Sequence, residues 1–80
     1  MNKHIPALEG QLRQYHLLRP SYITLKLHNG VLKFVLKTPV CSRMQCPQRE
    51  FILGEDLDEA QLELDKVARK VQKINGLHHR

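Results

Sequence analysis

The chain has 80 residues, of which 41 % are apolar and 26 % are charged, with four glycines and four prolines. This composition excludes collagen, low-complexity disorder and a coiled-coil rod, and the length predicts one small domain over residues 1–80 with a modest core. No apolar run is long enough to span a bilayer, and the N-terminus lacks the apolar stretch of a signal peptide. We therefore expect no membrane partner. Two cysteines are too few for a disulfide scaffold, so we also expect an intracellular, reducing location, the cytoplasm.

The first predicted element is a helix over residues 6–17. Pro6 suits the first turn of a helix because its missing N–H would have no partner there. Pro20 restricts the residue before it and ends the segment. The apolar positions at helical spacing are Leu8, Leu12 and Tyr15.

The strongest local pattern is a β-hairpin over residues 21–38. Asn29-Gly30 favours the two positive φ values of a type I′ turn between the β-rich runs 21–28 and 31–38. The two-residue turn fixes the register, and the period of two assigns each side chain to a face. We expect the core face to carry Ile23, Leu25, Leu27, Leu32, Phe34 and Leu36. The outer face would carry Tyr22, Thr24, Lys26, His28, Val31, Lys33, Val35 and Lys37.

Residues 39–49 contain two prolines and no regular pattern, which predicts a loop. Residues 50–53 predict a short third strand that ends at Gly54. This strand would extend the hairpin into a small antiparallel sheet.

A second, longer helix is predicted to begin at Asp56, with Glu59 at capping-box spacing. Asn75-Gly76 indicates its end, so residues 76–80 would form a flexible tail. Its apolar stripe consists of Leu57, Ala60, Leu64, Val67, Val71 and Ile74. The element order is then α-β-β-(β)-α. The predicted fold class is α+β, with the small antiparallel sheet packed against both helices.

The net charge of +5 is segregated along the sequence. Residues 1–49 hold eight Lys or Arg and one acid, residues 50–65 hold seven acids and no Lys or Arg, and residues 66–80 hold five Lys or Arg. The last two blocks suit the two ends of one helix dipole. The first block has no such explanation and indicates a negatively charged partner.

The outer face of the hairpin is the best candidate for this partner. Lysines at repeated spacing can contact phosphates, and an aromatic ring adds a stacking surface. We expect a non-enzymatic regulatory protein that binds DNA or RNA through Tyr22, Lys26, Lys33, Lys37, Arg43 and Arg49. The alternative is a solvated sheet face whose lysines prevent aggregation through the sheet edge.

A second hypothesis is a protein-binding regulator, inhibitor or adaptor that acts through the second helix and the segregated charge, including as a homodimer. Its interface would consist of Leu57, Leu64, Val67, Val71 and Ile74. A stripe of this kind more often packs on a sheet of the same chain.

Catalysis and metal binding are the weaker hypotheses. His28 beside Lys26 and Lys33 resembles a general base of an RNA-cleaving enzyme, but the sequence holds no complete catalytic set. For Cys41 and Cys46, free thiols are the first expectation, with a local disulfide or a zinc site as alternatives. The zinc site would also need His78 and His79, whose adjacent side chains rarely reach one metal together. We therefore expect no cofactor and no metal.

Overall fold

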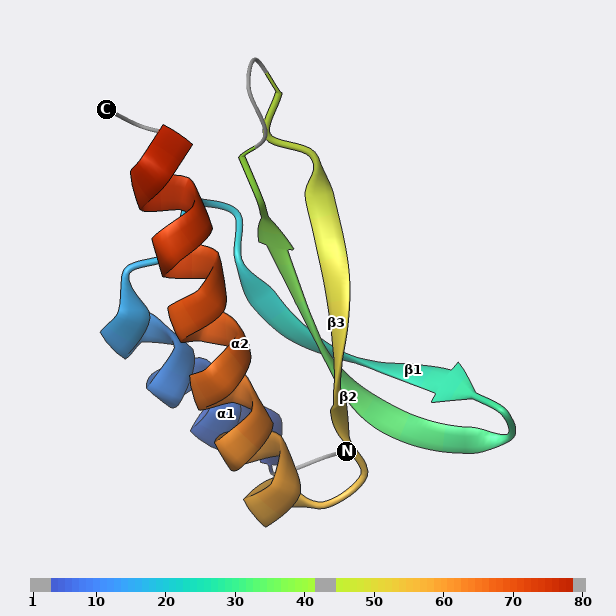
Figure 1. Ribbon diagram of the computed structural model, residues 1–80. Coiled ribbons are helices and arrows are strands. Elements are labelled where there is room, and N and C mark those ends of the chain that lie inside the picture. The colour runs from blue at the N-terminus through green and yellow to red at the C-terminus, as the bar shows by residue number, and fades with distance from the viewer. Residues whose placement is uncertain (1–3, 42–44, 79–80) are drawn as a thin grey trace.

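The computed structural model describes residues 4–41 and 45–78, with side chains up to residue 76 (Figure 1). The chain forms α1 (His4–Leu12), the 3₁₀ turn η1 (Arg13–Tyr15), β1 (Tyr22–His28), β2 (Val31–Pro39), β3 (Gln48–Gly54) and α2 (Leu57–His78). This order confirms the predicted α+β fold class. Within the described ranges, no helix is both long and apolar enough to cross a membrane.

The three strands form one antiparallel sheet in the order β1-β2-β3, and α1 and α2 lie together over one of its faces (Figure 1). Asn29 and Gly30 have φ values of 53° and 81°, as a type I′ turn requires. The register is the predicted one, with Lys26 opposite Lys33. The hairpin and the faces of its side chains are therefore confirmed.

The core lies between the sheet and the two helices. Phe34 and Leu36 of β2 contribute its centre, and each is no more than 2 % exposed. The surrounding buried residues are Leu8, Leu12, Ile23, Leu53, Ala60 and Leu64. Each element thus supplies the apolar face that its periodicity predicts.

Two residues of the predicted core face are not buried. Leu27 is 69 % exposed and Leu32 is 57 % exposed, although both lie on the same face as Phe34. The reason is the length of the neighbouring elements: β3 ends at Gly54, opposite Phe34, so the hairpin extends beyond the third strand and the helices (Figure 1). The prediction that these two leucines belong to the core is wrong.

The second helix starts close to its predicted position. The Ala60 N–H donates to the Asp56 carbonyl oxygen at 2.8 Å, which forms the first helical bond. Glu59 reaches back as a capping residue, but its Oε1 accepts from the Glu55 N–H at 3.0 Å rather than from Asp56. Gly54 makes room for this side chain, since a Cβ there would lie 2.1 Å from Glu59 Oε1.

The predicted helix end at Asn75-Gly76 is wrong, because α2 continues to His78. Asn75 is buried, and its side chain accepts a hydrogen bond from the Cys41 N–H at 2.8 Å and donates one to the Pro39 carbonyl oxygen at 3.2 Å. The amide therefore binds the segment after β2 instead of ending the helix. Of the predicted tail, residues 76–78 are helical, and residues 79–80 lie outside the described residues.

Candidate nucleic-acid interface

The outer face of the sheet contains an acid that the sequence analysis did not assign to it. Glu50 is paired with Lys37 in the register of β2 and β3. Its Oε2 lies 2.6 Å from Lys26 Nζ and 3.4 Å from Lys37 Nζ. Because Lys26 is on β1 and Glu50 is on β3, this ion pair crosses the central strand. Glu50 thus compensates part of the positive charge of the predicted site.

The ion pairs have the expected effect on protonation. Hydrogen bonding from Lys26, and to a smaller extent from Lys37, holds the pKa of Glu50 below its ordinary value. The pKa of Lys37 is raised, first by its contact with the Tyr22 hydroxyl and then by Glu50. These groups are solvent-exposed, so salt screens their interaction. The raised pKa of Lys37 and the lowered pKa of Glu50 both favour the charged forms.

The same face has an apolar centre. Val35 lies on it and is only 2 % exposed, while its cross-strand partner Ile52 is 46 % exposed. At the start of β1, the Tyr22 ring lies 5.8 Å from Lys37 Nζ, within the range of a cation–π contact. Tyr22, Lys26 and Lys37 are therefore brought together as one ordered surface.

Among the other predicted binding residues that the structure describes, only Lys33 lies on this face. Lys33 is half-buried opposite Lys26, and it belongs to no ion pair within the described part of the chain. Arg49 is exposed but shares the helix-side face of β3 with Phe51, so it lies apart from the lysines. Arg43 lies outside the described residues. Four of the six predicted residues thus share one face.

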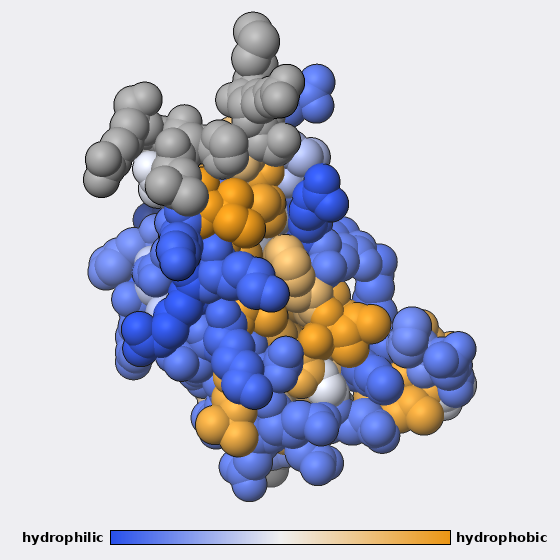
Figure 2. Space-filling model, in the orientation of Figure 1, coloured by the Kyte–Doolittle hydropathy of each residue, from blue (hydrophilic) through white to orange (hydrophobic). Residues whose placement is uncertain are grey.

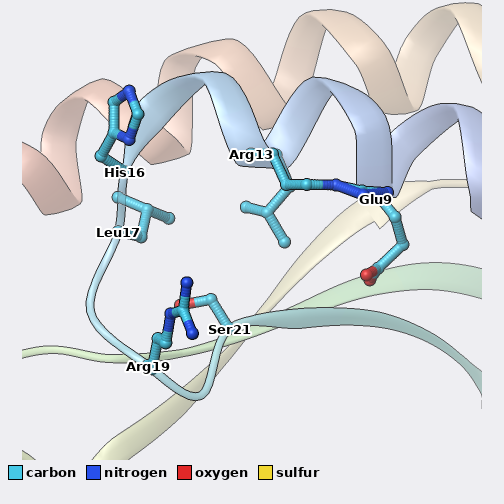
Figure 3. Close-up of a pocket in the computed structure, with 7 residues that line it drawn as sticks. Glu9, Arg13, His16, Leu17, Arg19 and Ser21 are labelled. Atoms are coloured by element: carbon cyan, nitrogen blue, oxygen red, sulfur yellow. The ribbon is translucent and has the colours of Figure 1, made fainter.

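A second basic surface surrounds the connector between η1 and β1. His16 has a left-handed backbone conformation with a φ of 53° and turns the chain out of η1. A pocket of about 260 Å³ follows, and Arg13 and Arg19 line it from its helix side and its connector side (Figure 3). The full lining is Glu9, Leu12, Arg13, His16, Leu17, Arg19 and Ser21. The Glu9 carboxylate accepts the Ile23 N–H of β1, and the lining holds two arginines against this one acid, so basic side chains outnumber acidic ones in the pocket.

Hydrogen bonds to three elements position this connector. The Ser21 hydroxyl contacts Thr38 Oγ1 of β2 at 2.7 Å, and Gln48 Nε2 of β3 donates to the Pro20 carbonyl oxygen at 3.0 Å. Gln72 of α2 donates to the Tyr15 carbonyl oxygen. The connector is therefore held against the sheet and against the last turns of α2.

Tyr15 links η1 to both helices through its hydroxyl group. Its hydroxyl donates to Asp65 Oδ1 at 2.9 Å and accepts from Gln11 Nε2 at 2.9 Å. Burial raises the pKa of Tyr15, and hydrogen bonding to Asp65 raises it further. The pKa of Asp65 is lowered, first by Arg69 and then by Tyr15. Tyr15 thus stays protonated and fixes η1, which ends next to the pocket.

The connector also packs against α2, at Gln72, Asn75 and Gly76. A second pocket of about 360 Å³ lies between the two segments, and His16 lines both pockets. The exposed basic residues of α2 are Lys66, Arg69, Lys70 and Lys73; they are not among the residues that line either pocket, and Arg69 is paired with Asp65. The helix dipole had seemed sufficient to explain them. Arg13 and Arg19 were missed because no local pattern shows that the connector folds back onto the sheet.

The apolar stripe of α2 packs within the chain. Leu64 and Val71 are fully buried, Leu57 and Val67 pack against the core, and Ile74 is half-buried. The stripe therefore offers little apolar surface to a second chain. Leu62, which is not part of the stripe, is 69 % exposed.

The two cysteines form a disulfide with an S–S distance of 2.09 Å, so the first expectation of free thiols is wrong and the local disulfide is confirmed. It closes the segment where the Val40 N–H donates to the Pro47 carbonyl oxygen at 3.0 Å. Among the described residues, no group of three or more His, Cys, Asp or Glu is placed to hold a metal ion. His79 lies outside that part of the chain.

Reduction of the Cys41–Cys46 disulfide is expected to lower the free energy of unfolding by about 2 kcal/mol, because the bond closes a short loop with a sequence separation of 5. Urea unfolding with and without a reducing thiol measures the difference. The variant Cys41→Ser/Cys46→Ser should show the same loss and no response to the thiol. Equal stability of the oxidised and reduced protein would contradict the prediction.

Protein-family models, curated proteins and solved structures were all compared with the chain, and none of them matches it.

Proposed function

We propose that this chain is a small non-enzymatic regulatory protein that binds the phosphate backbone of nucleic acid. The observation that carries the proposal is the pocket lined by Arg13, His16 and Arg19, in which the two arginines outnumber the one acid, Glu9. Arginine N–H groups suit phosphate oxygens in charge and geometry. The proposed binding site consists of this pocket and the outer face of the hairpin.

The two surfaces lie on opposite sides of the sheet edge at the start of β1, because Ser21 faces the helix side with Thr38 and Tyr22 faces the outer side with Lys37. Ser21 lines the pocket, and the next residue, Tyr22, begins the outer face with Lys37 beside its ring. A strand of nucleic acid bound at the pocket would pass around this edge and continue over the outer face of β1 and β2 toward Lys33. Repeated phosphate contacts of this kind give an affinity that falls steeply with salt. The surface favours neither DNA nor RNA.

Charge reversal at the pocket is expected to weaken binding at least tenfold. Fluorescence anisotropy with labelled single- and double-stranded DNA and RNA, titrated across salt, compares the wild type with Arg19→Glu. Lys66→Glu is the matched control, because it changes the net charge equally but lies on α2, outside the pocket and the hairpin face. Equal losses in both variants would leave only a non-specific charge effect. Absence of binding at low salt would exclude the proposed function.

Glu50→Gln is expected to raise the affinity several-fold. The substitution removes the carboxylate that binds Lys26 and Lys37, and it leaves both ammonium groups available for phosphates. The same anisotropy titration measures the effect, and the slope of affinity against salt should become steeper. An unchanged affinity and slope would remove the outer hairpin face from the site and restrict binding to the pocket.

The proposal includes a cytoplasmic location. The Cys41–Cys46 disulfide makes this part of the proposal testable, because disulfides rarely persist in that reducing compartment. Cell fractionation of the full chain, followed by thiol labelling, should recover the protein in the cytoplasm with its cysteines mostly reduced. Recovery of the oxidised protein outside the cytoplasm would contradict the location but not the binding chemistry.

A further inference from the structure

The Cys41–Cys46 disulfide joins the segment after β2 to the segment before β3, and its two cysteines differ in their access to solvent. Cys41 is only 2 % exposed, whereas Cys46 is an exposed residue. The hydrogen bond from the Val40 N–H to the Pro47 carbonyl oxygen holds the two sides of the disulfide together. Because a thiolate must approach the sulfur that it attacks, an external thiol reaches this disulfide through Cys46.

The chemistry of this approach is thiol–disulfide exchange. The thiolate of a small thiol such as glutathione attacks Cys46 Sγ, a new S–S bond forms there, and the bond to Cys41 breaks. The electron pair of the broken bond goes to Cys41 Sγ, which takes up a proton. A second thiolate then attacks the glutathione sulfur and releases Cys46 as a thiolate, which also takes up a proton. In total, two glutathione molecules are oxidised to one glutathione disulfide, and the protein disulfide is reduced to two thiols.

The chain is expected to stay folded in both redox states. The disulfide has a sequence separation of 5, and a disulfide in so short a loop stabilises a fold less than one in a long loop. Neither cysteine belongs to the core cluster that includes Phe34 and Leu36. Reduction therefore leaves the core between the sheet and the helices intact, and its structural effect begins at the end of β2.

The end of β2 is also where the C-terminal part of α2 is attached. Asn75 is only 6 % exposed, and its side chain accepts from the Cys41 N–H at 2.8 Å and donates to the Pro39 carbonyl oxygen at 3.2 Å. Apolar packing does not seal this contact, since Ile74 is half-buried and Figure 2 shows an uncovered apolar strip between α2 and the sheet. The attachment therefore depends on the position of the Cys41 backbone, which the disulfide restrains.

The same part of α2 supports the connector between η1 and β1. Asn75 lines the second pocket together with His16 and Leu17 of the connector. Gln72, one turn earlier on α2, donates a hydrogen bond to the Tyr15 carbonyl oxygen. A displacement of this end of α2 would thus remove contacts from the connector. Because His16 also lines the basic pocket, a change at the disulfide would extend to the neighbourhood of that pocket.

We propose that Cys41 and Cys46 form a reversible redox switch. Exchange with a small thiol at Cys46 opens the disulfide, releases the restraint on the Cys41 backbone, and loosens the C-terminal part of α2 together with the connector. The reverse exchange, in which glutathione disulfide oxidises the two thiols, restores the attached state. The proposal does not depend on nucleic-acid binding.

Single-cysteine variants of the full chain test the site of exchange. Cys41→Ser leaves only the Cys46 thiol, and Cys46→Ser leaves only the Cys41 thiol. With glutathione disulfide as the probe and mass spectrometry as the readout, Cys41→Ser should form the mixed disulfide at least tenfold faster. The wild-type chain should pass from oxidised to reduced, and back, as the ratio of glutathione to glutathione disulfide is varied. Equal rates in the two variants, or a wild-type chain that stays in one state at every ratio, would overturn the proposal.

Hydrogen exchange of the oxidised and the reduced full chain, without nucleic acid, tests the conformational change. After reduction, the amides of Cys41, of the connector and of α2 around Asn75 should exchange faster, by a factor at least ten times that at Phe34 and Leu36. The last two amides report global unfolding, because both residues lie in the centre of the core. Cys41→Ser/Cys46→Ser should show the reduced pattern with and without the thiol, and circular dichroism checks that it is folded. A uniform change over the whole chain, or no change at the end of α2, would contradict the switch.

Discussion

Phe34→Ala is expected to lower the free energy of unfolding by about 3–5 kcal/mol, whereas Leu32→Ala should lower it by less than about 1 kcal/mol. The two residues lie on the same face of β2, two positions apart. Phe34 is 2 % exposed and packs in the core, with the His4 ring 6.3 Å from its own in an edge-to-face arrangement. Leu32 is 57 % exposed, so its truncation leaves no cavity.

Urea unfolding followed by circular dichroism measures both changes. The total stability of so small a domain is a few kcal/mol, so Phe34→Ala is expected to be largely unfolded at room temperature. Leu36→Ala serves as a second buried position on the same strand, fully buried on the same face. Similar losses for Leu32→Ala and Phe34→Ala would show that the hairpin end is covered in solution.

This comparison indicates what the hairpin pattern could predict and what it could not. Alternation and the Asn29-Gly30 turn determine the register and the face of each side chain, because both are properties of adjacent residues. Burial also requires a second layer above that face. The end of β3 at Gly54, opposite Phe34, decides how far this layer extends, and no pattern within residues 21–38 contains that information.

In the candidate site, too, some residues could be predicted from the sequence and others could not. The lysines of the outer face follow from the period of two, and the structure places Lys26, Lys33 and Lys37 on that face. Glu50 was counted only as part of an acidic segment of the sequence. Its spacing of two residues from Ile52 in the third strand could have shown that both side chains lie on the same face of the sheet. The pocket between Arg13 and Arg19 depends on the contact of the connector with β2 and β3, which links residues distant in sequence.

The cysteines illustrate a pattern that allows more than one structure. A separation of 5 between Cys41 and Cys46 is compatible with free thiols, with two metal ligands and with a disulfide. The backbone bond between Val40 and Pro47 brings the two sides of the loop together and selects the disulfide. This hydrogen bond pairs two residues that composition and spacing do not distinguish from any other loop residues.

Asn75→Ala is expected to lower the free energy of unfolding by about 2–4 kcal/mol, a large effect for a polar residue near a helix end. The side chain of Asn75 is only 6 % exposed and binds the Cys41 N–H and the Pro39 carbonyl oxygen. Alanine would leave both backbone groups buried without these partners. Gln72→Ala is the control, because Gln72 also binds a backbone carbonyl, that of Tyr15, but lies at the surface.

Urea unfolding gives the stability of both variants, and hydrogen exchange at the Cys41 amide reports the local bond. We expect the exchange rate to rise in Asn75→Ala and to stay unchanged in Gln72→Ala. Equal, small losses in the two variants would mean that water replaces the Asn75 amide, so that the helix end and the segment after β2 are not held together by it. A large loss of stability in Asn75→Ala alone would explain why an Asn-Gly pair, which usually ends a helix, lies inside this one. The side-chain amide of Asn75 binds the backbone at the end of β2 and so stabilises the last turns of α2.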